Sequence, residues 1–326
     1  VFGMFMAILD IQIVSASLTE IQAGLSASAD EIPWVQTAYL IAEVIMIPLS
    51  GFLSRMLSTR VLFTISAAGF TAASAMAATA TNIDQMIVYR AIQGFIGGGM
   101  IPSVFAAAFT IFPASKRAVI TPMIGLVATI APTIGPTVGG YISHAFSWHW
   151  LFLINVVPGI LVASAAWSLI DFDKPNLALF RKFDWWGLLG MAGFLGGLEY
   201  VLEEGPNHDW LQDQAVFVCA AVATTGAALF FWRVFTAEEP IVDLKAFTNV
   251  NFAFGSLFSF VIGIGLYGLT YLYPIYLGRV RGYDSMMIGD ALFVSGLAMF
   301  VMAPVSGILS RKMDPRVMMM IGFVGF

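Results

Sequence analysis

Long apolar stretches dominate this sequence and restrict it to a membrane-spanning fold. A bilayer span needs about 20 predominantly apolar residues, and ten stretches of this kind can be marked. Only 11% of the residues are charged and the mean hydropathy is +0.86, whereas soluble domains carry about 25% charged residues. We therefore expect an all-α polytopic membrane protein, because a helix satisfies its own backbone hydrogen bonds inside lipid. The stretches lie near Phe2–Leu25, Trp34–Leu53, Val61–Ala80, Ile83–Phe112, Val119–Phe146, Trp150–Ile170, Trp185–Leu202, Ala215–Phe235, Phe252–Leu277 and Met286–Leu309.

Both ends of the chain lie inside apolar runs. Val1 falls within the first stretch, and an eleventh stretch begins at Val317 and reaches Phe326. We therefore expect the chain to be a fragment of a longer protein. The single Cys219 excludes a disulfide within the chain.

The distribution of Lys and Arg predicts the orientation of the spans. If the first span starts in the cytoplasm, two basic residues, Arg279 and Arg281, lie in an outward loop, and Arg90 lies within a span. The other twelve lie in inward loops, as the positive-inside rule requires, so we expect a multi-pass protein of the cell (inner or plasma) membrane with a cytoplasmic N-terminus. These twelve are Arg55, Arg60, Lys116, Arg117, Lys174, Arg181, Lys182, Arg233, Lys245, Arg311, Lys312 and Arg316.

An internal repeat predicts two related halves. The segment MIPLSGFLSR at 46–55 recurs as MAPVSGILSR at 302–311, an offset of 256 residues. An arginine after an inward-going span is common by itself, but Pro, Ser, Gly and Leu match here as well. Internal repeats of this kind mark the halves of transporters. The first copy ends the second predicted span, and the second copy ends the tenth. If two six-span halves followed each other directly, the second copy would end span eight.

The position of the repeat therefore predicts two extra spans between the halves and fourteen spans in the complete protein. We divide the chain into an N-terminal six-span half at 1–170, two extra spans with cytoplasmic linkers at 171–250, and a partial C-terminal half at 251–326. The last part would hold spans nine and ten and the start of span eleven.

One predicted span contains an unusual set of helix breakers. Gly and Pro interrupt the apolar segment APTIGPTVGGY at 131–141, although they cost about 1 and 3 kcal/mol in a helix interior in water. Membrane helices tolerate them where neighbouring helices satisfy the freed backbone groups. The resulting face has almost no side chains, so another helix can approach closely. The residues of this face are Ala131, Pro132, Gly135, Pro136, Gly139 and Gly140.

Two charged residues inside predicted spans are candidates for function. Asp10 lies in an apolar helix, where the charged form of a carboxyl group is costly, so it can bind and release a proton. Arg90 must face an aqueous cavity or a partner, and we expect Asp10 to be that partner, with Gln93 hydrogen-bonded in the same site. Structural alternatives are a hydrogen bond from Asp10 to a neighbouring helix and an Arg90 cap on carbonyls of the first span.

A second group of residues is predicted to line a substrate cavity. Glu43 lies in the middle of span two, where it could bind a proton or a cationic compound, and Tyr39, Gln93 and Tyr271 could line the same cavity. The alternative for such aromatic residues is that they face lipid or the interface. Glu199 lies in the first extra span, which we expect to pack outside the central cavity.

Several motifs resemble those of a known family. Asn155 in SWHWLFLINVVPG, Arg90 in YRAIQGFIGGG and the Gly135-Pro136 pair are similar to signatures of the major facilitator superfamily, in particular its fourteen-span drug/proton antiporter group of the EmrB/QacA type. Leu9-Asp10 followed by Ile13-Val14 resembles the first-span motif of this group. The loop from Gly51 to Arg60 resembles the cytoplasmic loop motif of the superfamily, except that Arg55 replaces the usual Asp and Ser58 the usual Gly.

The resemblance implies a major facilitator fold and a proton-coupled multidrug efflux transporter. Asp10 and Arg90 would couple to protons, and amphipathic compounds, including cationic ones, would leave the cytoplasm by alternating access. The Gly-Pro motif at 131–141 would then pack against spans of the other half and seal the outer end of the cavity. In this family the motif is associated with antiport.

The remaining expectations concern partners and alternatives. The proton gradient would drive transport, and no cofactor would be needed. If the source is a Gram-negative bacterium, the resemblance implies a periplasmic adaptor and an outer-membrane channel as partners. A specific metabolite or siderophore exporter, or a symporter, on the same fold is the alternative. A membrane scaffold or an enzyme is disfavoured, because the sequence has no clustered His, Cys or acidic ligands, no metal site and no phosphate-binding loop.

Overall fold

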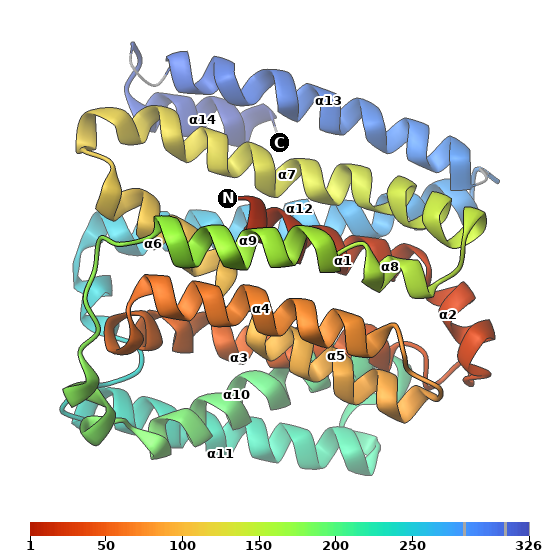
Figure 1. The fold of residues 1–326 in the computed structure, drawn as a ribbon, viewed down its shortest axis with the longest axis horizontal. Helices are drawn as coiled ribbons and strands as arrows, with labels where there is room; N and C mark the ends of the chain where they lie inside the picture. Colours follow the sequence, from red (N-terminus) through yellow and green to blue (C-terminus); the bar gives the residue numbers. More distant parts are fainter. Residues whose placement is uncertain (283–284, 310–311, 326) are drawn as a thin grey trace.

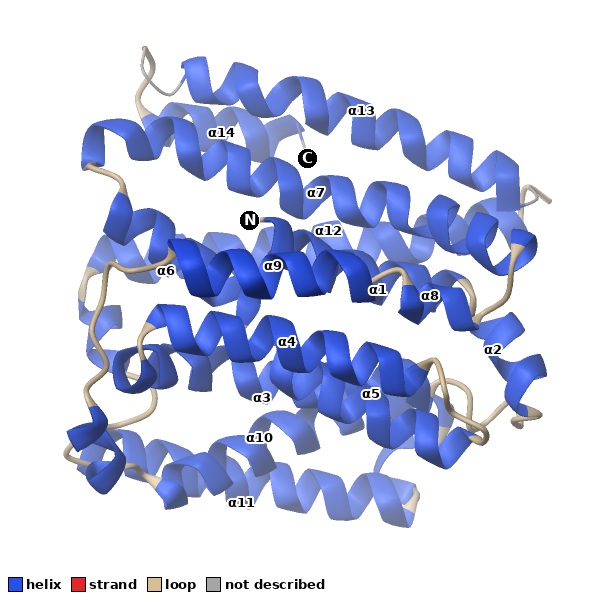
Figure 2. Cartoon of the chain, in the orientation of Figure 1, coloured by secondary structure: helices blue, strands red, loops and turns tan. Residues whose placement is uncertain are grey.

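The described part of the chain is a bundle of helices that lie side by side (Figures 1 and 2). A computed structural model describes residues 1–282, 285–309 and 312–325, and these residues contain helices and loops but no strand. The α-helices are α1 (Phe2–Ala16), α2 (Leu18–Leu25), α3 (Trp34–Leu57), α4 (Thr59–Ala77), α5 (Ile83–Gly97), α6 (Met100–Ile111), α7 (Ala114–Ala145), α8 (His149–Leu153), α9 (Val156–Leu169), α10 (Trp185–Glu204), α11 (Gln214–Thr236), α12 (Val250–Arg279), α13 (Ser285–Leu309) and α14 (Pro315–Gly325). Short 3-10 helices are η1 (Leu177–Lys182), η2 (Gly205–Asn207), η3 (Trp210–Gln212) and η4 (Leu244–Thr248).

Most of the predicted spans correspond to helices long and apolar enough to cross a membrane. Within the described residues, five helices meet this test by length and composition, and up to seven do if each of two bent helix pairs is one span. Three other predicted spans are also helical, as α10, α12 and α13, but they are not among these seven.

The first predicted span is bent rather than straight. It consists of α1 and α2, whose axes differ by 67°. At the break the Ser17 backbone N–H donates to the carbonyl of Val14 at 3.0 Å, three residues back rather than four. This tighter turn ends α1 and redirects the chain, so the uniform hydropathy of Phe2–Leu25 did not predict the bend.

Of the two extra helices, α10 packs directly against α3 and α11 packs on α10. In Figure 1, α10 and α11 lie at one edge, beside α3, and α13 and α14 lie at the opposite edge. Burial of apolar side chains joins α10 and α11 to α3. This cluster contains Met46, Leu49, Phe52, Met56, Leu62, Met191, Phe230 and Ile241.

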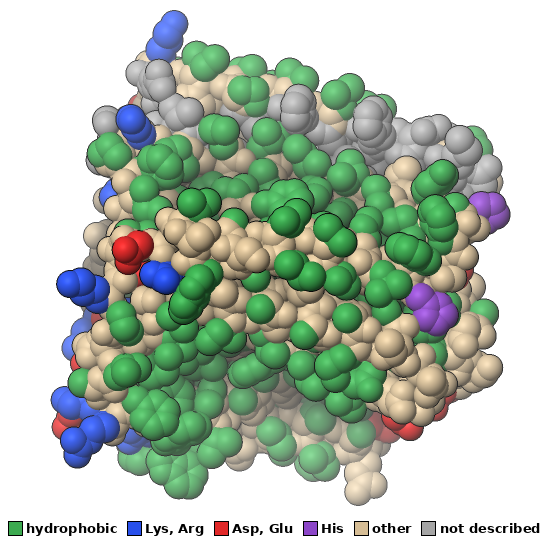
Figure 3. Space-filling view, in the orientation of Figure 1, with side chains coloured by type: hydrophobic (Ala, Val, Ile, Leu, Met, Phe, Trp, Pro, Cys, Tyr) green, Lys and Arg blue, Asp and Glu red, His purple; other side chains and the backbone are tan. Residues whose placement is uncertain are grey.

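The charged side chains separate to the two ends of the bundle. Figure 3 shows Lys and Arg gathered at one end of the visible face, His at the other end, and hydrophobic side chains between them. This pattern is that of a helix bundle with a lipid-facing belt. At the end rich in Lys and Arg, called the basic end below, ion pairs join Arg55 to Glu239 at 3.8 Å, Lys182 to Glu238 at 3.0 Å and Arg233 to Asp184 at 2.8 Å.

The predicted loop motif covers the last turns of α3, the connecting residue Ser58 and the start of α4, at the basic end. Gly51 has no atom within 4 Å of the position that a Cβ would take. The Arg60 guanidinium lies 4.4 Å from the centre of the Trp167 ring on α9. Arg55, which replaces the usual Asp of the motif, pairs instead with Glu239 in the linker before α12.

Ser58 has a backbone conformation that suits glycine better. Its φ is 81° and its ψ is 152°, a region that is essentially restricted to Gly. Its side chain accepts a hydrogen bond from the Val61 N–H, and Asp173 accepts hydrogen bonds from the N–H and Oγ1 of Thr59 at 2.7 Å each. The two caps hold the first turn of α4 in place although Ser58 is strained.

We expect Ser58→Gly to stabilise the protein and Ser58→Ala to destabilise it. Glycine removes about 1–3 kcal/mol of backbone strain and, as a helix cap, costs only a few tenths of a kcal/mol relative to serine. Alanine keeps the strain and loses the cap, which costs about 1 kcal/mol. Thermal unfolding in detergent, followed by tryptophan fluorescence, should rank glycine above serine and serine above alanine. A glycine variant less stable than wild type would contradict this explanation.

Candidate functional site

A fully buried ion pair joins α1 to α5. Arg90 Nη1 lies 2.6 Å from Asp10 Oδ2, and both side chains have 0% exposure. The predicted partner of Arg90 is therefore correct. Two opposite charges removed from water cost several kcal/mol each in desolvation, which only close pairing and further hydrogen bonds can offset.

The other oxygen of Asp10 is held by two amide side chains. Gln93 Nε2 donates to Asp10 Oδ1 at 3.1 Å, and Asn155 Nδ2 donates to the same atom at 2.6 Å. Gln93 Nε2 also donates to Ser74 Oγ at 2.7 Å. The site therefore joins α1, α4, α5 and the junction between α8 and α9 through one polar network.

Two members of this network had no assigned role in the sequence. Asn155 was noted only within a family motif, although a lone amide in an apolar stretch was a usable signal. Ser74 lies in a run of Ala, Ser and Thr, which offered no signal at all.

Arg90 is also held by α3. Its Nε donates to the Val35 carbonyl at 3.1 Å, and its Nη1 donates to Gln93 Oε1 at 2.7 Å. The guanidinium carbon lies 4.3 Å from the centre of the Tyr39 ring, so a cation–π contact adds to the pairing. The capped carbonyl belongs to α3 and not to the first span, which corrects the structural alternative stated above. Among the described atoms, Arg90 Nη2 has no hydrogen-bond partner.

Glycines at the end of α5 allow this close approach of α3. A Cβ on Gly94 would collide with the Tyr39 carbonyl oxygen. A Cβ on Gly98 would lie 3.1 Å from the Glu43 carbonyl oxygen and 3.0 Å from Met46 Cβ. The two backbones are close at Gly94 and again about one turn later at Gly98, and this contact brings Arg90 beside Val35 and Tyr39.

The Gly-Pro motif of α7 packs against α1. A Cβ on Gly139 would lie 2.7 Å from the Ile13 carbonyl oxygen and 3.0 Å from its Cα, and a Cβ on Gly135 would collide with Gln12. Ile13 is three residues beyond Asp10, or about one helical turn. The motif therefore contacts α1 next to the buried ion pair.

This contact corrects the predicted partner of the motif. Spans of the other half were expected on this face, but Gly135 and Gly139 lie against the first span of the same half, while α7 also contacts α13 of the other half. The two glycines are four residues apart, on one line of the helix, and this line lies against Gln12 and Ile13 of α1.

The other motif residues do not share one contact. Ala131 is buried, and Pro132 and Pro136 are half-buried. Gly140 is exposed, with no atom within 4 Å of a Cβ position, so it does not belong to the packed face. The axes of Met123–Pro132 and Ile134–Ala145 differ by 41°, as expected near a proline inside a helix.

Tyr39 and Glu43 lie inside the packed bundle. Tyr39 is 0% exposed and Glu43 is 6% exposed, and the Tyr39 OH and Glu43 Oε1 have no hydrogen-bond partner among the described atoms. The Tyr271 side chain lies outside the described residues. The substrate-cavity role of Tyr39, Glu43, Gln93 and Tyr271 stays a prediction.

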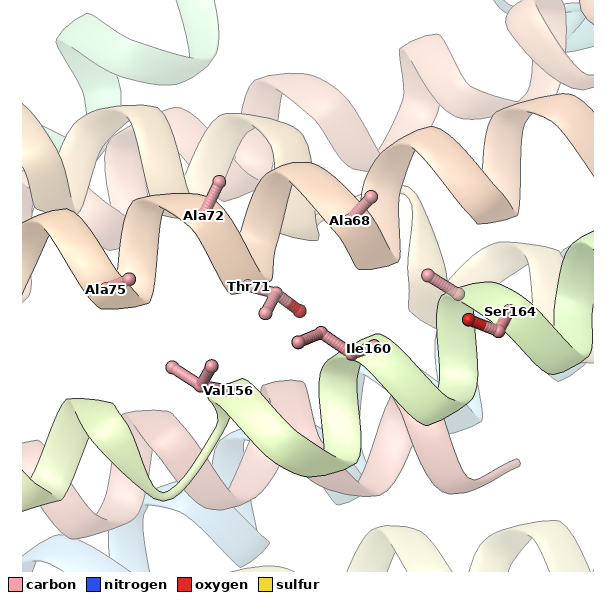
Figure 4. A pocket seen from close by; sticks show the side chains of 8 residues that line it. Ala68, Thr71, Ala72, Ala75, Val156, Ile160 and Ser164 are labelled. Carbon is pink, nitrogen blue, oxygen red and sulfur yellow. The ribbon is translucent and has the colours of Figure 1, made fainter.

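A groove lies elsewhere, between α4 and α9 (Figure 4). It has a volume of about 400 Å³ and contains none of the residues predicted to bind substrate or protons. Its lining consists of Ala68, Thr71, Ala72, Ala75, Val156, Ile160, Ala163 and Ser164.

Comparison with known families agrees with the helix bundle. The sequence matches the family described as Major Facilitator Superfamily over residues 1–326. The chain belongs to this superfamily. The major facilitator fold predicted from the sequence motifs is therefore confirmed.

Two individual relatives indicate which group of the superfamily this chain resembles. The chain is 48% identical over 324 residues to the "Colistin resistance protein EmrB" of Acinetobacter baumannii, covering 99% of this chain and 63% of that protein. It is 29% identical over 321 residues to the "Multidrug export protein EmrB" of Escherichia coli, covering 98% of this chain and 62% of that protein. These similarities support the predicted EmrB-type group, and the chain spans less than two thirds of the length of both relatives.

A solved structure supports the fold. The human organic anion transporter MFSD10 superimposes with a TM-score of 0.58 at 17% identity, over 96% of this chain and 71% of that one. At this level of identity the similarity concerns the fold.

We expect removal of one charge of the Asp10–Arg90 pair to destabilise this protein more than removal of both charges. Arg90→Met leaves Asp10 without its counter-charge, which costs about 3–5 kcal/mol. Asp10→Asn combined with Arg90→Met removes both charges and should recover part of this loss. Thermal unfolding in detergent measures the difference, and Arg55→Met, which removes an exposed ion pair worth about 0–1 kcal/mol, is the control. A double variant whose loss equals the sum of the single losses would contradict the coupling.

Gly139→Val and Gly140→Val form a matched test of the α7 contact. Valine at 139 would overlap the backbone of Ile13, and overpacking of this kind costs about 1–3 kcal/mol. Valine at 140 would enter open space and should leave the melting temperature unchanged. Equal melting temperatures for the two variants would show that α7 does not pack on α1 in this way.

Proposed function

We propose that this chain belongs to a drug/proton antiporter, in which the Asp10–Arg90 pair is the coupling site. The observation that carries the proposal is the buried ion pair with its network, which connects four elements of the bundle. Intramembrane acids and their partners mark proton relays in pumps and transporters, and a purely structural bundle has little use for a buried charge pair, because apolar residues of similar volume are often at least as stable.

The geometry supports competition between a proton and Arg90 for one atom. Asp10 Oδ1 already accepts hydrogen bonds from Gln93 and Asn155, while Oδ2 accepts from Arg90. A proton arriving at Oδ2 would neutralise Asp10 and release Arg90 from its partner. Since Asp10 lies on α1 and Arg90 on α5, the release changes what holds these helices together.

The packing of the Gly-Pro motif extends this coupling to α7. Gly139 touches the backbone of Ile13, about one turn from Asp10. A shift of α1 after protonation would therefore move the surface against which α7 packs. In the antiport cycle this contact would limit leak at the outer end of the cavity.

The direction of transport follows from the proposed orientation. We place the basic end in the cytoplasm, with a cytoplasmic N-terminus, according to the positive-inside rule. One elementary charge that crosses a potential of 100 mV contributes about 2.3 kcal/mol, so inward proton flow can drive a compound outward by alternating access. The two six-span halves and two extra spans of the family fold would form the pathway.

The substrate class in this proposal is amphipathic small molecules, including cationic ones. The names of the two EmrB relatives refer to colistin resistance and to multidrug export, and the buried Glu43 would provide a negative charge near Tyr39. In a Gram-negative cell, a periplasmic adaptor and an outer-membrane channel would carry the compound onward.

We expect proteoliposomes containing the full chain to release protons when a transported compound is added. Asp10→Asn should melt at a lower temperature than wild type, because it leaves the buried Arg90 charge unpaired, but it should still elute as a folded protein and release no protons, because the amide cannot exchange one. A pH-sensitive dye measures release against a panel of amphipathic compounds, and Arg55→Gln at the surface of the basic end is the control. If wild type released no protons with any compound, antiport would be excluded, and proton uptake together with the compound would indicate symport.

A further inference from the structure

The groove between α4 and α9 opens on the outer surface of the helix bundle. Thr71 of α4 and Ile160 of α9 point toward each other across it (Figure 4). The two helices touch where a Cβ on Gly159 would collide with Thr71, so they form the walls of a surface depression. Ile160 and the adjacent Leu161 are 56% and 65% exposed. Exposed apolar side chains in the middle of a membrane-spanning bundle face acyl chains, so the groove opens into the hydrocarbon region of the bilayer.

The two walls of the groove continue to an arginine and a tryptophan at the basic end. On α4, Arg60 precedes the lining residue Ala68 by two steps of four residues, and on α9, Trp167 follows the lining residue Ala163 by one such step. Residues four apart share a face of a helix. The Arg60 guanidinium lies 4.4 Å from the centre of the Trp167 ring, so this pair closes the groove at its basic end. Arginine and tryptophan side chains are typical of the level of the lipid headgroups.

The positive charge of Arg60 is available to an anion at this level. The described residues provide no ion pair to it, and its Nε is buried without a hydrogen-bond partner among the described atoms. The nearby Asp173 uses its Oδ2 for two hydrogen bonds from Thr59. The Arg60 guanidinium can therefore donate to a phosphate group, which its planar arrangement of N–H groups suits well.

The width of the groove suits a single acyl chain. Val156 and Ser164, at the two ends of its α9 wall, are eight residues apart, or about 12 Å along the helix. A volume of about 400 Å³ over this length corresponds to a mean cross-section of about 30 Å². A helix with its side chains has a diameter of about 10–12 Å and hence a cross-section about three times larger. A helix therefore does not fit into the groove, whereas a flexible hydrocarbon chain does.

We propose that this groove binds one membrane phospholipid, with an acyl chain between α4 and α9 and the phosphate at Arg60. The small and apolar side chains of the lining would contact the chain, and Trp167 would lie beside the glycerol region. Basic sites between membrane helices bind lipid headgroups in this way. The groove contains neither Asp10 nor Arg90, so the inference is independent of the proposed antiport.

The bound lipid would stabilise the part of the bundle that holds the buried polar network. Ser74 directly precedes the lining residue Ala75, and Asn155 directly precedes the lining residue Val156. Ser74 and Asn155 both belong to the network around Asp10. A chain in the groove adds van der Waals contacts to α4 and α9, which are a main source of helix association in lipid. Lipid binding should therefore raise the melting temperature.

The experiment uses the full chain in detergent after removal of bound lipid. Native mass spectrometry should detect dioleoylphosphatidylglycerol bound to wild type, and thermal unfolding should show a higher melting temperature with this lipid. Dioleoylglycerol has the same chains without the phosphate, and glycerol phosphate has the phosphate without the chains. Each of these two compounds should bind more weakly than the phospholipid and should raise the melting temperature less.

Two variants test the two ends of the proposed site. Arg60→Gln should weaken binding of dioleoylphosphatidylglycerol by about fivefold, the effect expected for one basic side chain near lipid phosphate. Ala68→Leu should weaken it as well, because the leucine side chain occupies the space of the acyl chain. Two matched controls should bind like wild type. Arg55→Gln removes an exposed basic residue at the same end, and Ala165→Leu adds the same volume at an exposed position of α9 outside the groove lining.

The contradicting results are distinct from one another. Wild-type binding of the phospholipid in both Arg60→Gln and Ala68→Leu would overturn the site. Equal binding of dioleoylglycerol would overturn the role of Arg60, and equal binding of glycerol phosphate would show a site for free anions instead. A wild-type dimer in lipid nanodiscs that Ala68→Leu abolishes would assign the groove to contact between two copies. If Arg60→Gln does not fold, Ala68→Leu and its control Ala165→Leu still decide whether the groove holds the chain.

Discussion

The buried pair of Asp10 and Arg90 is the interaction on which the arrangement of this bundle depends. Its two charges have 0% exposure and a separation of 2.6 Å, so neither can be left without the other at low cost. The amides of Gln93 and Asn155 complete the hydrogen bonding of Asp10. Because these residues come from different spans, the requirement to satisfy one carboxylate determines how four elements are placed relative to one another.

Small residues make this polar centre possible. Backbone contact at Gly94 and Gly98 brings α5 onto α3, and backbone contact at Gly139 brings α7 onto α1. In lipid the hydrophobic effect between helices is weak, so close van der Waals packing and interhelical hydrogen bonds hold the bundle together. The glycine contacts and the ion pair therefore act on the same helices, and movement at one is transmitted to the other.

The extra helices take part in this arrangement. Helix α10 packs on α3 at one edge of the bundle, with Gly196 near Ile41 and Ile45 and the Tyr200 ring beside Trp34. In a fold assembled from two related halves, an inserted pair of spans can thus add to the packing of the N-terminal half.

The sequence by itself determined the class, the approximate spans, the family and the pairing of Asp10 with Arg90, because hydropathy acts locally along the chain and a buried charge needs an opposite one. Only the tertiary structure decided which polar groups complete the site and which helix covers Gly139. Asn155 and Asp10 are 145 residues apart, and Ser74 is one small polar residue among many. Their contact depends on which helices pack side by side. Helices of similar hydropathy do not indicate in their own sequences which helices will be their neighbours.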